Sequence, residues 1–362
     1  MRPTLDHPQS PVKPAPRLPA DAANRPPTII DVAAYAGVSK SVVSRVLRAD
    51  PAVSPARREA VLVAVDALRY RPNAVARSLV QRRTFNVGVI VSDLHNLFFA
   101  EILDGIASAA AAAGYKVLIT SGNLDATVES VALETLLQLR TDGIILAGSR
   151  LSAAAIRAAS RSVPIALVTS GMRAPGVDTI ATDDVKGAWL AVEHLVNLGH
   201  SRIAMVDGGA GAGSEERRRG YGAAMHRFGL GRHILVAPGD FTEDGGRHGT
   251  QSLLAGQPWT RTKTRPTAIC AANDMAAIGA LNAIAEAGLE VPRDVSVVGY
   301  DNTALAALRH VSLTTVHQPR FQIGEMAMTA LLRRLQRPAA RSRHDLLEPS
   351  LVIRQTTAPP TL

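Results

Sequence analysis

The stretch TIIDVAAYAGVSKSVVSRVL, residues 28–47, decides the architecture of the N-terminal part of the chain. Thr28 followed three residues later by Asp31 is a variant of the capping box, so we expect a helix to begin there. Gly37 interrupts this helix, because a residue without a Cβ lets the chain turn sharply, and Ser39 is a suitable cap for a second helix. Two short helices joined by a glycine turn are typical of a helix-turn-helix unit.

The residues of the second helix separate into an apolar and a polar face at helical spacing. The apolar face consists of Val42, Val43, Val46 and Leu47. The polar face consists of Lys40, Ser41, Ser44, Arg45 and Arg48. A helix lying in the major groove of DNA needs such donors for phosphates and for guanine O6 and N7. A three-helix bundle with a solvated basic face has the same pattern, so charge and periodicity alone leave both interpretations open.

Positive charge is concentrated in this N-terminal part. Residues 1–85 contain 14 Lys and Arg against 6 Asp and Glu, whereas the whole chain contains 40 against 31. A basic segment attached to a nearly neutral body indicates a module that binds nucleic acid or another anionic surface. Residues 1–27 are rich in proline and lack periodicity, so we expect a disordered arm.

From residue 86 onward, apolar runs that predict strands alternate with helical patterns. The predicted strands are Val87–Val91, Val117–Thr120, Gly143–Ala147 and Ile165–Val168, then Ile203–Val206, Ile234–Val236, Ala268–Ala271 and Val295–Val298. Helical patterns such as Phe99–Ala113, Val185–Leu198 and Met275–Ala287 lie between them. Apolar strands that alternate with helices predict parallel sheets covered on both faces. Two series predict two similar α/β lobes, and a further strand and helix over Val316–Leu335 predict that the chain crosses between the lobes more than once.

Several function classes are disfavoured by what the sequence lacks. The single cysteine, Cys270, lies in an apolar run, so we expect an inert buried thiol and a cytoplasmic protein. The N-terminus lacks the apolar segment of a secretory signal, which a periplasmic solute-binding protein would need, and no stretch approaches the ~20 apolar residues of a membrane span. The glycine-rich run Gly208–Gly213 matches no nucleotide-binding motif, and no nucleophile elbow or metal-spaced cluster is present. We therefore predict no catalytic residue, metal or cofactor, and no enzyme.

The chain closely resembles the lac repressor/galactose repressor family of bacterial transcriptional regulators. Besides residues 28–47, the motifs that carry the resemblance are Val53-Ser54, Arg57-Arg58, Tyr70–Leu79, His194–Ala204, Asn273–Gly279, Gly299–Asn302 and Leu313–Pro319. The resemblance implies a sequence-specific DNA-binding regulator, a repressor, whose affinity for DNA is controlled by a small molecule. It implies a periplasmic-binding-protein-like body with the effector between two lobes, and a homodimer on a pseudo-palindromic double-stranded operator.

The resemblance also assigns DNA-binding residues. Lys40, Ser41 and Arg45 match the positions that read bases. Leu79 matches the hinge-helix leucine that wedges into the minor groove, where unstacking is offset by the bend, and Ala76 matches the small residue beside it. Further DNA-binding positions are expected at Thr28, Ser39, Ser44, Ser54 and Asn73.

In the body, the resemblance assigns an effector site. Arg217 matches the arginine that clamps the ligand, Asp301 the acid that accepts from hydroxyls, and Phe241 an aromatic that stacks on the ligand. The other expected contacts are Phe98, Thr169, Asn273 and Gln318. A sugar or similar polyol fits this set, and a purine or other planar ligand is the alternative, because Thr169 replaces an aspartate that many relatives have. Phe98 also fits a core role, and Asn273 also fits a helix cap.

These inferences divide the chain into an arm (residues 1–27), a DNA-binding domain (28–72), a hinge helix with linker (73–85), and a body for effector binding and dimerisation (86–362). Within the body we expect lobe 1 over about 86–180 and 315–342, and lobe 2 over about 181–314 and 343–362.

Overall fold

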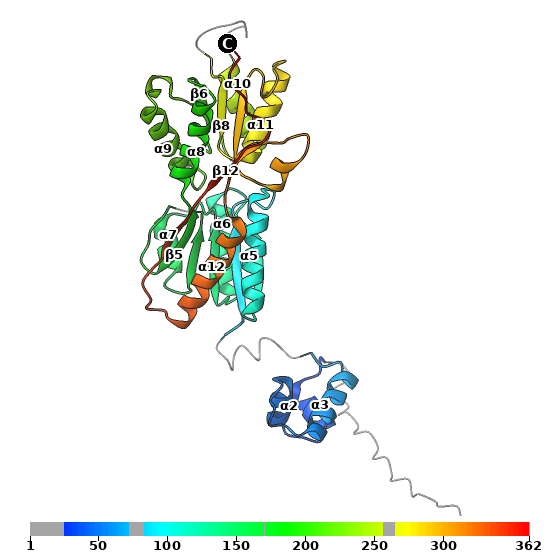
Figure 1. The fold of residues 1–362 in the computed structure, drawn as a ribbon. Coiled ribbons are helices and arrows are strands. Elements are labelled where there is room, and N and C mark those ends of the chain that lie inside the picture. The colour runs from blue at the N-terminus through cyan, green and yellow to red at the C-terminus, as the bar shows by residue number, and fades with distance from the viewer. Residues whose placement is uncertain (1–24, 72–82, 170, 256–264, 362) are drawn as a thin grey trace, which may run out of the picture. The chain divides into compact units, whose positions relative to one another are not determined.

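The computed structural model describes residues 25–71, 83–169, 171–255 and 265–361. The chain forms two compact units, Met1–Thr84 and Phe85–Leu362. The first unit is helical and the second is an α/β body of two lobes (Figure 1), so the predicted fold class is confirmed. Among the described residues, no helix is long and apolar enough to cross a membrane.

The first unit contains three helices, α1 (Ile29–Tyr35), α2 (Lys40–Leu47) and α3 (Pro55–Ala67). Their ends follow the local signals of the sequence. The Thr28 hydroxyl accepts from the Asp31 amide at 3.4 Å while the Asp31 carboxylate accepts from the Thr28 amide at 2.7 Å, which completes the capping box. The Ser39 hydroxyl caps α2 by accepting from the Val42 amide at 3.4 Å. The helices enclose a small core that includes the fully buried Val32, Val43, Val61 and Ala64.

The arm expected over residues 1–27 overlaps the described residues at its C-terminal end, from Arg25 onward. Arg25 donates to both oxygens of the Asp31 carboxylate, at 2.8 and 2.9 Å, and so belongs to the start of the helical unit. This charged fork lowers the pKa of Asp31 well below its ordinary value. The expected hinge positions Asn73, Ala76 and Leu79 lie outside the described residues.

The first lobe of the body is a six-stranded parallel sheet in the order β11-β5-β4-β3-β1-β2. Its strands are β1 (Asn86–Val91), β2 (Lys116–Ser121), β3 (Gly143–Ala147), β4 (Ile165–Val168), β5 (Val177–Thr182) and β11 (His344–Leu347). Helices α5 (Phe98–Ala112) and α12 (Arg320–Gln336) pack on one face, and α6 (Ala126–Gln138) and α7 (Ala153–Ala159) pack on the other.

The second lobe repeats this plan in the order β12-β10-β9-β8-β6-β7, with only β12 antiparallel to its neighbour. Its strands are β6 (Ile203–Val206), β7 (Leu235–Ala237), β8 (Ala268–Ala271), β9 (Ser296–Asp301), β10 (Thr314–His317) and β12 (Ser350–Val352). Its helices are α8 (Asp184–Asn197), α9 (Ser214–Arg227), α10 (Glu243–Leu254) and α11 (Asp274–Glu286), with 3₁₀ turns η2 (Gly231–His233) and η3 (Ala304–Ala307).

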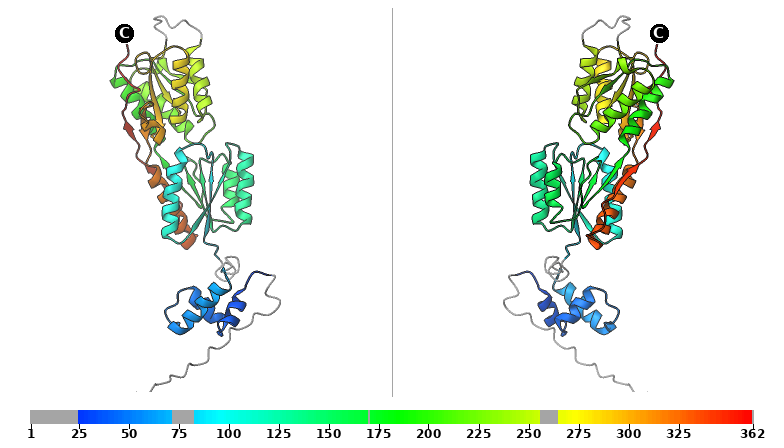
Figure 2. Two further views of the ribbon diagram at one scale, coloured as in Figure 1. Left: turned by 90° about the vertical axis from the view of Figure 1, so that its right-hand side faces the viewer. Right: turned by 90° about the vertical axis from the view of Figure 1, so that its left-hand side faces the viewer.

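The chain crosses between the lobes three times: after β5, after β10 and after β11. Figure 2 shows the last crossing as the red C-terminal segment that runs along one side of both lobes. The expected lobe boundaries are wrong in two places. Strand β10 belongs to the second sheet, although residues from 315 were assigned to lobe 1, and β11 belongs to the first sheet, although residues from 343 were assigned to lobe 2. Both assignments depend on long-range pairing, which local periodicity does not encode.

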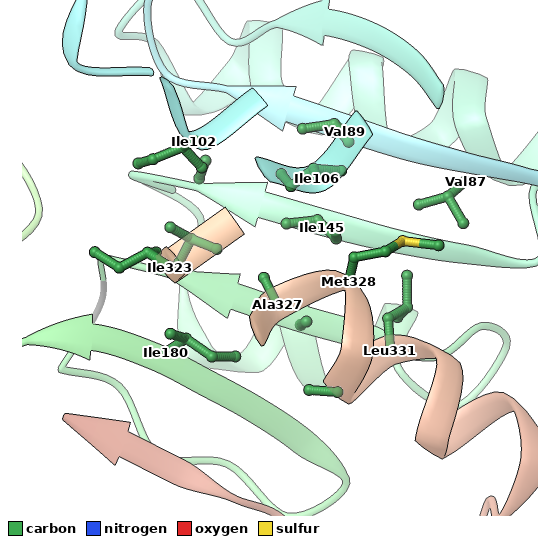
Figure 3. Packing of buried hydrophobic residues seen from close by; sticks show 14 of the residues in the cluster. Val87, Val89, Ile102, Ile106, Ile145, Ile180, Ile323, Ala327, Met328 and Leu331 are labelled. Carbon is green, nitrogen blue, oxygen red and sulfur yellow. The ribbon is translucent and has the colours of Figure 1, made fainter. Parts of the chain in front are cut away.

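The core of the first lobe brings together the two helices that are furthest apart in its sequence. Figure 3 shows Ile102 and Ile106 of α5 near Ile323 of α12, with strand residues around them. The helices approach closely because each has a glycine against the backbone of the other: a Cβ on Gly105 would lie 2.1 Å from the Phe321 carbonyl oxygen, and a Cβ on Gly324 would lie 2.1 Å from the Ile102 carbonyl oxygen. A segment that follows the second lobe in sequence therefore completes the first.

The single cysteine matches its prediction. Cys270 lies on β8 and is buried, and burial raises the pKa of its thiol to about 12. A thiol with so high a pKa has almost no thiolate at neutral pH and is a poor nucleophile.

Candidate functional site

Helix α2 exposes its polar face as the sequence predicts. Lys40, Ser41 and Arg45 are exposed and Ser44 is half-buried, whereas Val43 and Val46 are buried against the other helices. A short helix with exposed cations and hydroxyls along one face fits the dimensions and the chemistry of the DNA major groove.

Three further DNA-binding candidates lie at the starts of the helices. Thr28, Ser39 and Ser54 are all exposed. The hydroxyls of Thr28 and Ser39 already cap α1 and α2, whereas Ser54 makes no cap bond with its side chain. Helix N-termini bind phosphate through backbone amides, so these three positions suit contacts to the DNA backbone.

One carboxylate on this surface was missed by the sequence analysis. Asp50 follows α2 and accepts from Arg45 Nε at 2.8 Å. This bond is the largest cause of a lowered pKa at Asp50. The signal in the sequence is an acid placed shortly after the helix end, opposite a basic last turn.

A cleft in the body lies where strands of both sheets end. It is lined by Ser92, Asp93, Asn96, Phe98, Phe99, Leu124, Gly148, Arg150, Thr169, Gly211, Ala212, Arg217, Phe241, Asn273 and Asp301. Residues after β1, β2, β3 and β4 contribute from the first lobe, and residues after β6, β7 and β8, with the last residue of β9, from the second. Because the strand order reverses at β1/β3 and at β6/β8, both sheets open a crevice there, which is the usual ligand position in such sheets.

Arg217 is held in this cleft by several contacts. It is 5% exposed, and its Nε donates to Asp184 Oδ1 at 2.9 Å while Nη1 donates to the Ala272 carbonyl at 2.6 Å. The guanidinium also lies 3.8 Å from the ring centre of Tyr300. Burial has the largest single effect and lowers the pKa of Arg217, but Asp184, Tyr300 and Asp301 together outweigh it and the pKa is raised, so the arginine stays charged.

Asp301 is held next to this arginine. Its Oδ1 lies 3.9 Å from Arg217 Nη1 and accepts from Gln318 Nε2 at 2.7 Å. Burial raises the pKa of Asp301 to about 8, against the lowering effect of the Arg217 charge. Gln318 is 1% exposed and does not line the cleft, so it acts on the cleft through Asp301.

The glycine-rich run that matched no nucleotide motif supports the aromatic wall. A Cβ on Gly208 would lie 2.5 Å from the Phe241 ring, and a Cβ on Gly211 would lie 2.3 Å from it. Glycine at both positions therefore lets the ring lie directly on the backbone of the loop. Gly211 and Phe241 both line the cleft, so the loop and the ring form part of the same wall.

The remaining candidates combine structural and cleft-lining roles. Asn273 caps α11 by accepting from the Ala276 amide at 2.8 Å, and its amide donates to the Phe241 carbonyl at 3.0 Å. Phe98 lines the cleft and also belongs to the hydrophobic core of the first lobe. Thr169 lines the cleft in a left-handed conformation, with φ of 58°.

Two family models match the chain. Residues 28–73 match "Bacterial regulatory proteins, lacI family", and residues 192–357 match a periplasmic binding protein-like domain. Catabolite control protein A of Priestia megaterium is 33% identical over 91% of this chain and 99% of its own length. The ribose operon repressor of Haemophilus influenzae is 34% identical over 91% of this chain and 98% of its own length. A lac repressor bound to ONPG in the repressed state superposes with a TM-score of 0.81 at 32% identity, covering 92% of this chain and all of that one.

The chain belongs to the lacI family. It is accordingly a DNA-binding transcriptional regulator with an effector domain, and not an enzyme. No group of three or more potential metal-binding side chains occurs among the residues that the structure describes.

Several residues of the first-lobe wall were not predicted from the sequence. Ser92 and Asp93 follow β1 directly, so the rule that ligands bind at strand ends could have found them. Arg150 follows β3 in the same way, and its Nε is buried without a hydrogen-bond partner among the described residues.

Proposed function

We propose that this regulator is a repressor that binds a pseudo-palindromic, double-stranded operator as a homodimer, in the cytoplasm. The exposed basic face of α2 supports the contact with DNA, and residues 28–72 form the DNA-binding domain in this proposal. One helix-turn-helix contacts few base pairs, so a two-fold pair of heads is needed for a specific site. A lac repressor dimer bound to operator is 32% identical over 92% of this chain, with a TM-score of 0.79, and supports the same assembly.

A hinge segment over residues 73–85 completes the DNA contact in this proposal. Leu79 wedges between base steps at the operator centre, with Asn73 and Ala76 beside it. Leu79→Ala is expected to weaken specific binding and reduce the operator bend while non-specific binding is retained. Unchanged bend and affinity, measured by gel mobility and titration, would remove the wedge role.

The effector in this proposal is a sugar or similar polyol bound in the cleft. The observation that carries it is the meeting of Arg217 and Asp301 at the strand ends, next to the ring of Phe241. An arginine donates to hydroxyl or ring oxygens, a carboxylate accepts from hydroxyls, and an aromatic face covers the C–H side of a pyranose. A family member from Enterococcus faecium with bound ribose is 28% identical and superposes with a TM-score of 0.68, which supports a sugar.

A purine or other planar ligand is the second candidate. The raised pKa of Asp301 favours it, because a protonated carboxyl can donate to a ring nitrogen. Thr169 favours it as well, because it leaves one hydroxyl acceptor fewer than an aspartate at that strand end.

Calorimetry with a panel of sugars, nucleobases and nucleosides tests the effector class. The wild type should bind one or more sugars, and Phe241→Ala and Asp301→Asn should each weaken that binding. Asp244→Asn, which removes an exposed carboxylate on α10, is the control for the charge change. If a nucleobase binds and no sugar does, the effector is a planar ligand and not a polyol. If both cleft variants bind the ligand as tightly as the wild type, the effector site lies outside this cleft.

Effector binding then controls DNA affinity through the three crossings between the lobes. A ligand that contacts both walls of the cleft changes the relative stability of two lobe arrangements, and the DNA-binding heads respond to that change. Operator titrations with and without the ligand found by calorimetry give the sign of this coupling, and equal operator affinity in both would contradict allosteric control.

A further inference from the structure

The last turn of α2 carries an arginine whose side chain is already held in place. Arg45 donates from Nε to Asp50 Oδ2 at 2.8 Å. Among the described residues, none accepts a hydrogen bond from its two terminal Nη groups. A guanidinium recognises guanine O6 and N7 with two parallel donors, so the Nη fork is the end that bidentate base contact uses.

The backbone after α2 explains why Asp50 lies beside Arg45. Ala49 adopts a left-handed conformation with φ of 57°. The Ala49 amide donates to the Val46 carbonyl at 2.9 Å, and the Asp50 amide donates to the Arg45 carbonyl at 3.0 Å. This pair of bonds is a Schellman motif, which returns the chain to the last turn of the helix. Residue 50 is thereby placed next to residue 45.

The carboxylate of Asp50 is itself fixed by its surroundings. Its second oxygen accepts from the Ala52 amide at 2.9 Å, and its backbone carbonyl accepts from Arg58 Nη2 at 2.6 Å. The hydrogen bonds from Arg45 and from the Ala52 amide also lower the pKa of Asp50, which keeps the carboxylate charged. Arg45 therefore pairs with an anchored group rather than with a second flexible side chain.

We propose that Asp50 is a positioning residue for base recognition, which holds Arg45 by Nε so that its Nη fork is oriented toward a guanine. This inference rests on the proposed operator binding by α2. A free arginine loses rotamer freedom when it binds, and a side chain ordered in advance loses less. The negative charge of Asp50 repels DNA phosphates, so its benefit appears in the discrimination between sequences and not in total affinity.

The test measures discrimination by the full-length chain. Selection from a random duplex library gives the preferred site. Each base pair of that site is then replaced in turn, and the pair read by Arg45 is the one whose replacement weakens binding by the wild type but not by Arg45→Ala. The readout is the ratio of Kd values for the duplex with that pair replaced and for the preferred duplex. Asp50→Asn is expected to lower this ratio about threefold to tenfold, the cost of ordering one long side chain. In the Arg45→Ala background, Asp50→Asn should not change this ratio further.

Asp66→Asn is the matched control, because Asp66 is exposed on α3 and the charge change is the same. Both variants gain non-specific affinity from the lost negative charge, but only Asp50→Asn should lose discrimination. Asp50→Glu keeps the charge and displaces it by one methylene, so it should also lower the ratio. This variant replaces Asp50→Asn in the test if Asp50→Asn does not fold. The positioning role of Asp50 would be overturned, with operator binding still standing, by either of two results. The Kd ratio could be the same in wild type and in the Asp50 variants, or Asp66→Asn could lower the ratio as much as Asp50→Asn does. A wild type that selects no site would overturn the proposed function together with the positioning role.

Discussion

Two arginine–carboxylate pairs in this regulator have nearly the same length and opposite surroundings. Arg45 and Asp50 are 2.8 Å apart with side chains 45% and 31% exposed, whereas Arg217 and Asp184 are 2.9 Å apart and 6% and 7% exposed. Exposed pairs contribute about 0–1 kcal/mol to stability. A buried pair costs desolvation when it forms, and loss of one partner leaves an uncompensated charge. The first pair is thus suited to orient a side chain, whereas the second contributes both to the lining of the cleft and to the stability of its lobe.

The largest expected effect comes from breaking the buried pair. Arg217→Ala should lower the free energy of unfolding of the body by about 3–5 kcal/mol, because Asp184 is left buried without its partner. It should also abolish effector binding. Chemical denaturation followed by far-UV circular dichroism measures the first effect, and calorimetry measures the second.

Two variants sharpen this prediction. Arg219→Ala, on the same helix and 62% exposed, should change stability by less than about 1 kcal/mol. The double variant Arg217→Ala/Asp184→Ala should recover part of the lost stability, since the orphaned charge is gone. No recovery would mean that Arg217 stabilises the lobe through its contacts with Ala272 and Tyr300 rather than through its charge.

Breaking the exposed pair should affect recognition instead of folding. Arg45→Ala should reduce discrimination at one base pair by about 1–3 kcal/mol, if it makes the bidentate guanine contact. Its unfolding free energy should stay within about 1 kcal/mol of wild type. Titration of the selected duplex and its single-base variants gives the answer, and an equal loss for all sequences would make Arg45 a phosphate contact.

The acid in the cleft predicts a pH dependence of effector binding. Because the pKa of Asp301 is raised to about 8, the carboxyl is mostly protonated at pH 7. A polyol that donates to the ionised carboxylate must displace this proton, so affinity should rise up to about tenfold, or about 1.4 kcal/mol, per pH unit below 8 and level off above it. Calorimetry from pH 6 to 9 measures this slope.

The same pH series distinguishes the two ligand classes. Asp301→Asn should flatten the slope, because the neighbouring Asp274 is bonded to Thr303 and Thr315 and does not line the cleft. A planar ligand that accepts from the protonated carboxyl would bind less tightly as pH rises. An effector affinity that falls as pH rises would therefore contradict a polyol effector.

The smallest expected effect concerns the stability of the helical unit. Asp50→Asn should leave the thermal stability of this unit nearly unchanged, because the pair with Arg45 is exposed and screened by salt. Thermal unfolding at low and high salt measures this. A large loss would mean that Asp50 acts mainly as part of the Schellman turn.

The sequence predicted the site unevenly. Asn273, Asp301 and Phe241 were identified through family motifs, and the cleft contains all three. Arg150 and Asp93 were missed, because each is a single polar residue after a strand with no motif around it. Gln318 was expected to contact the effector, yet it is buried behind Asp301, because a sequence position does not reveal on which side of a strand end an amide lies.

Local physics let the sequence determine where elements begin and what type they are. The Thr28–Asp31 box, the Ser39 cap and the apolar run Gly143–Ala147 depend on neighbours a few residues away, and all three occur as predicted. The tertiary structure alone decided that β11 joins the first sheet and that Arg217 meets Asp184 and Tyr300. These contacts join residues up to 165 positions apart, as between Arg343 and Asp178 beside β11. Their geometry depends on sheet register and on the three crossings between lobes, which hydrophobic periodicity does not specify.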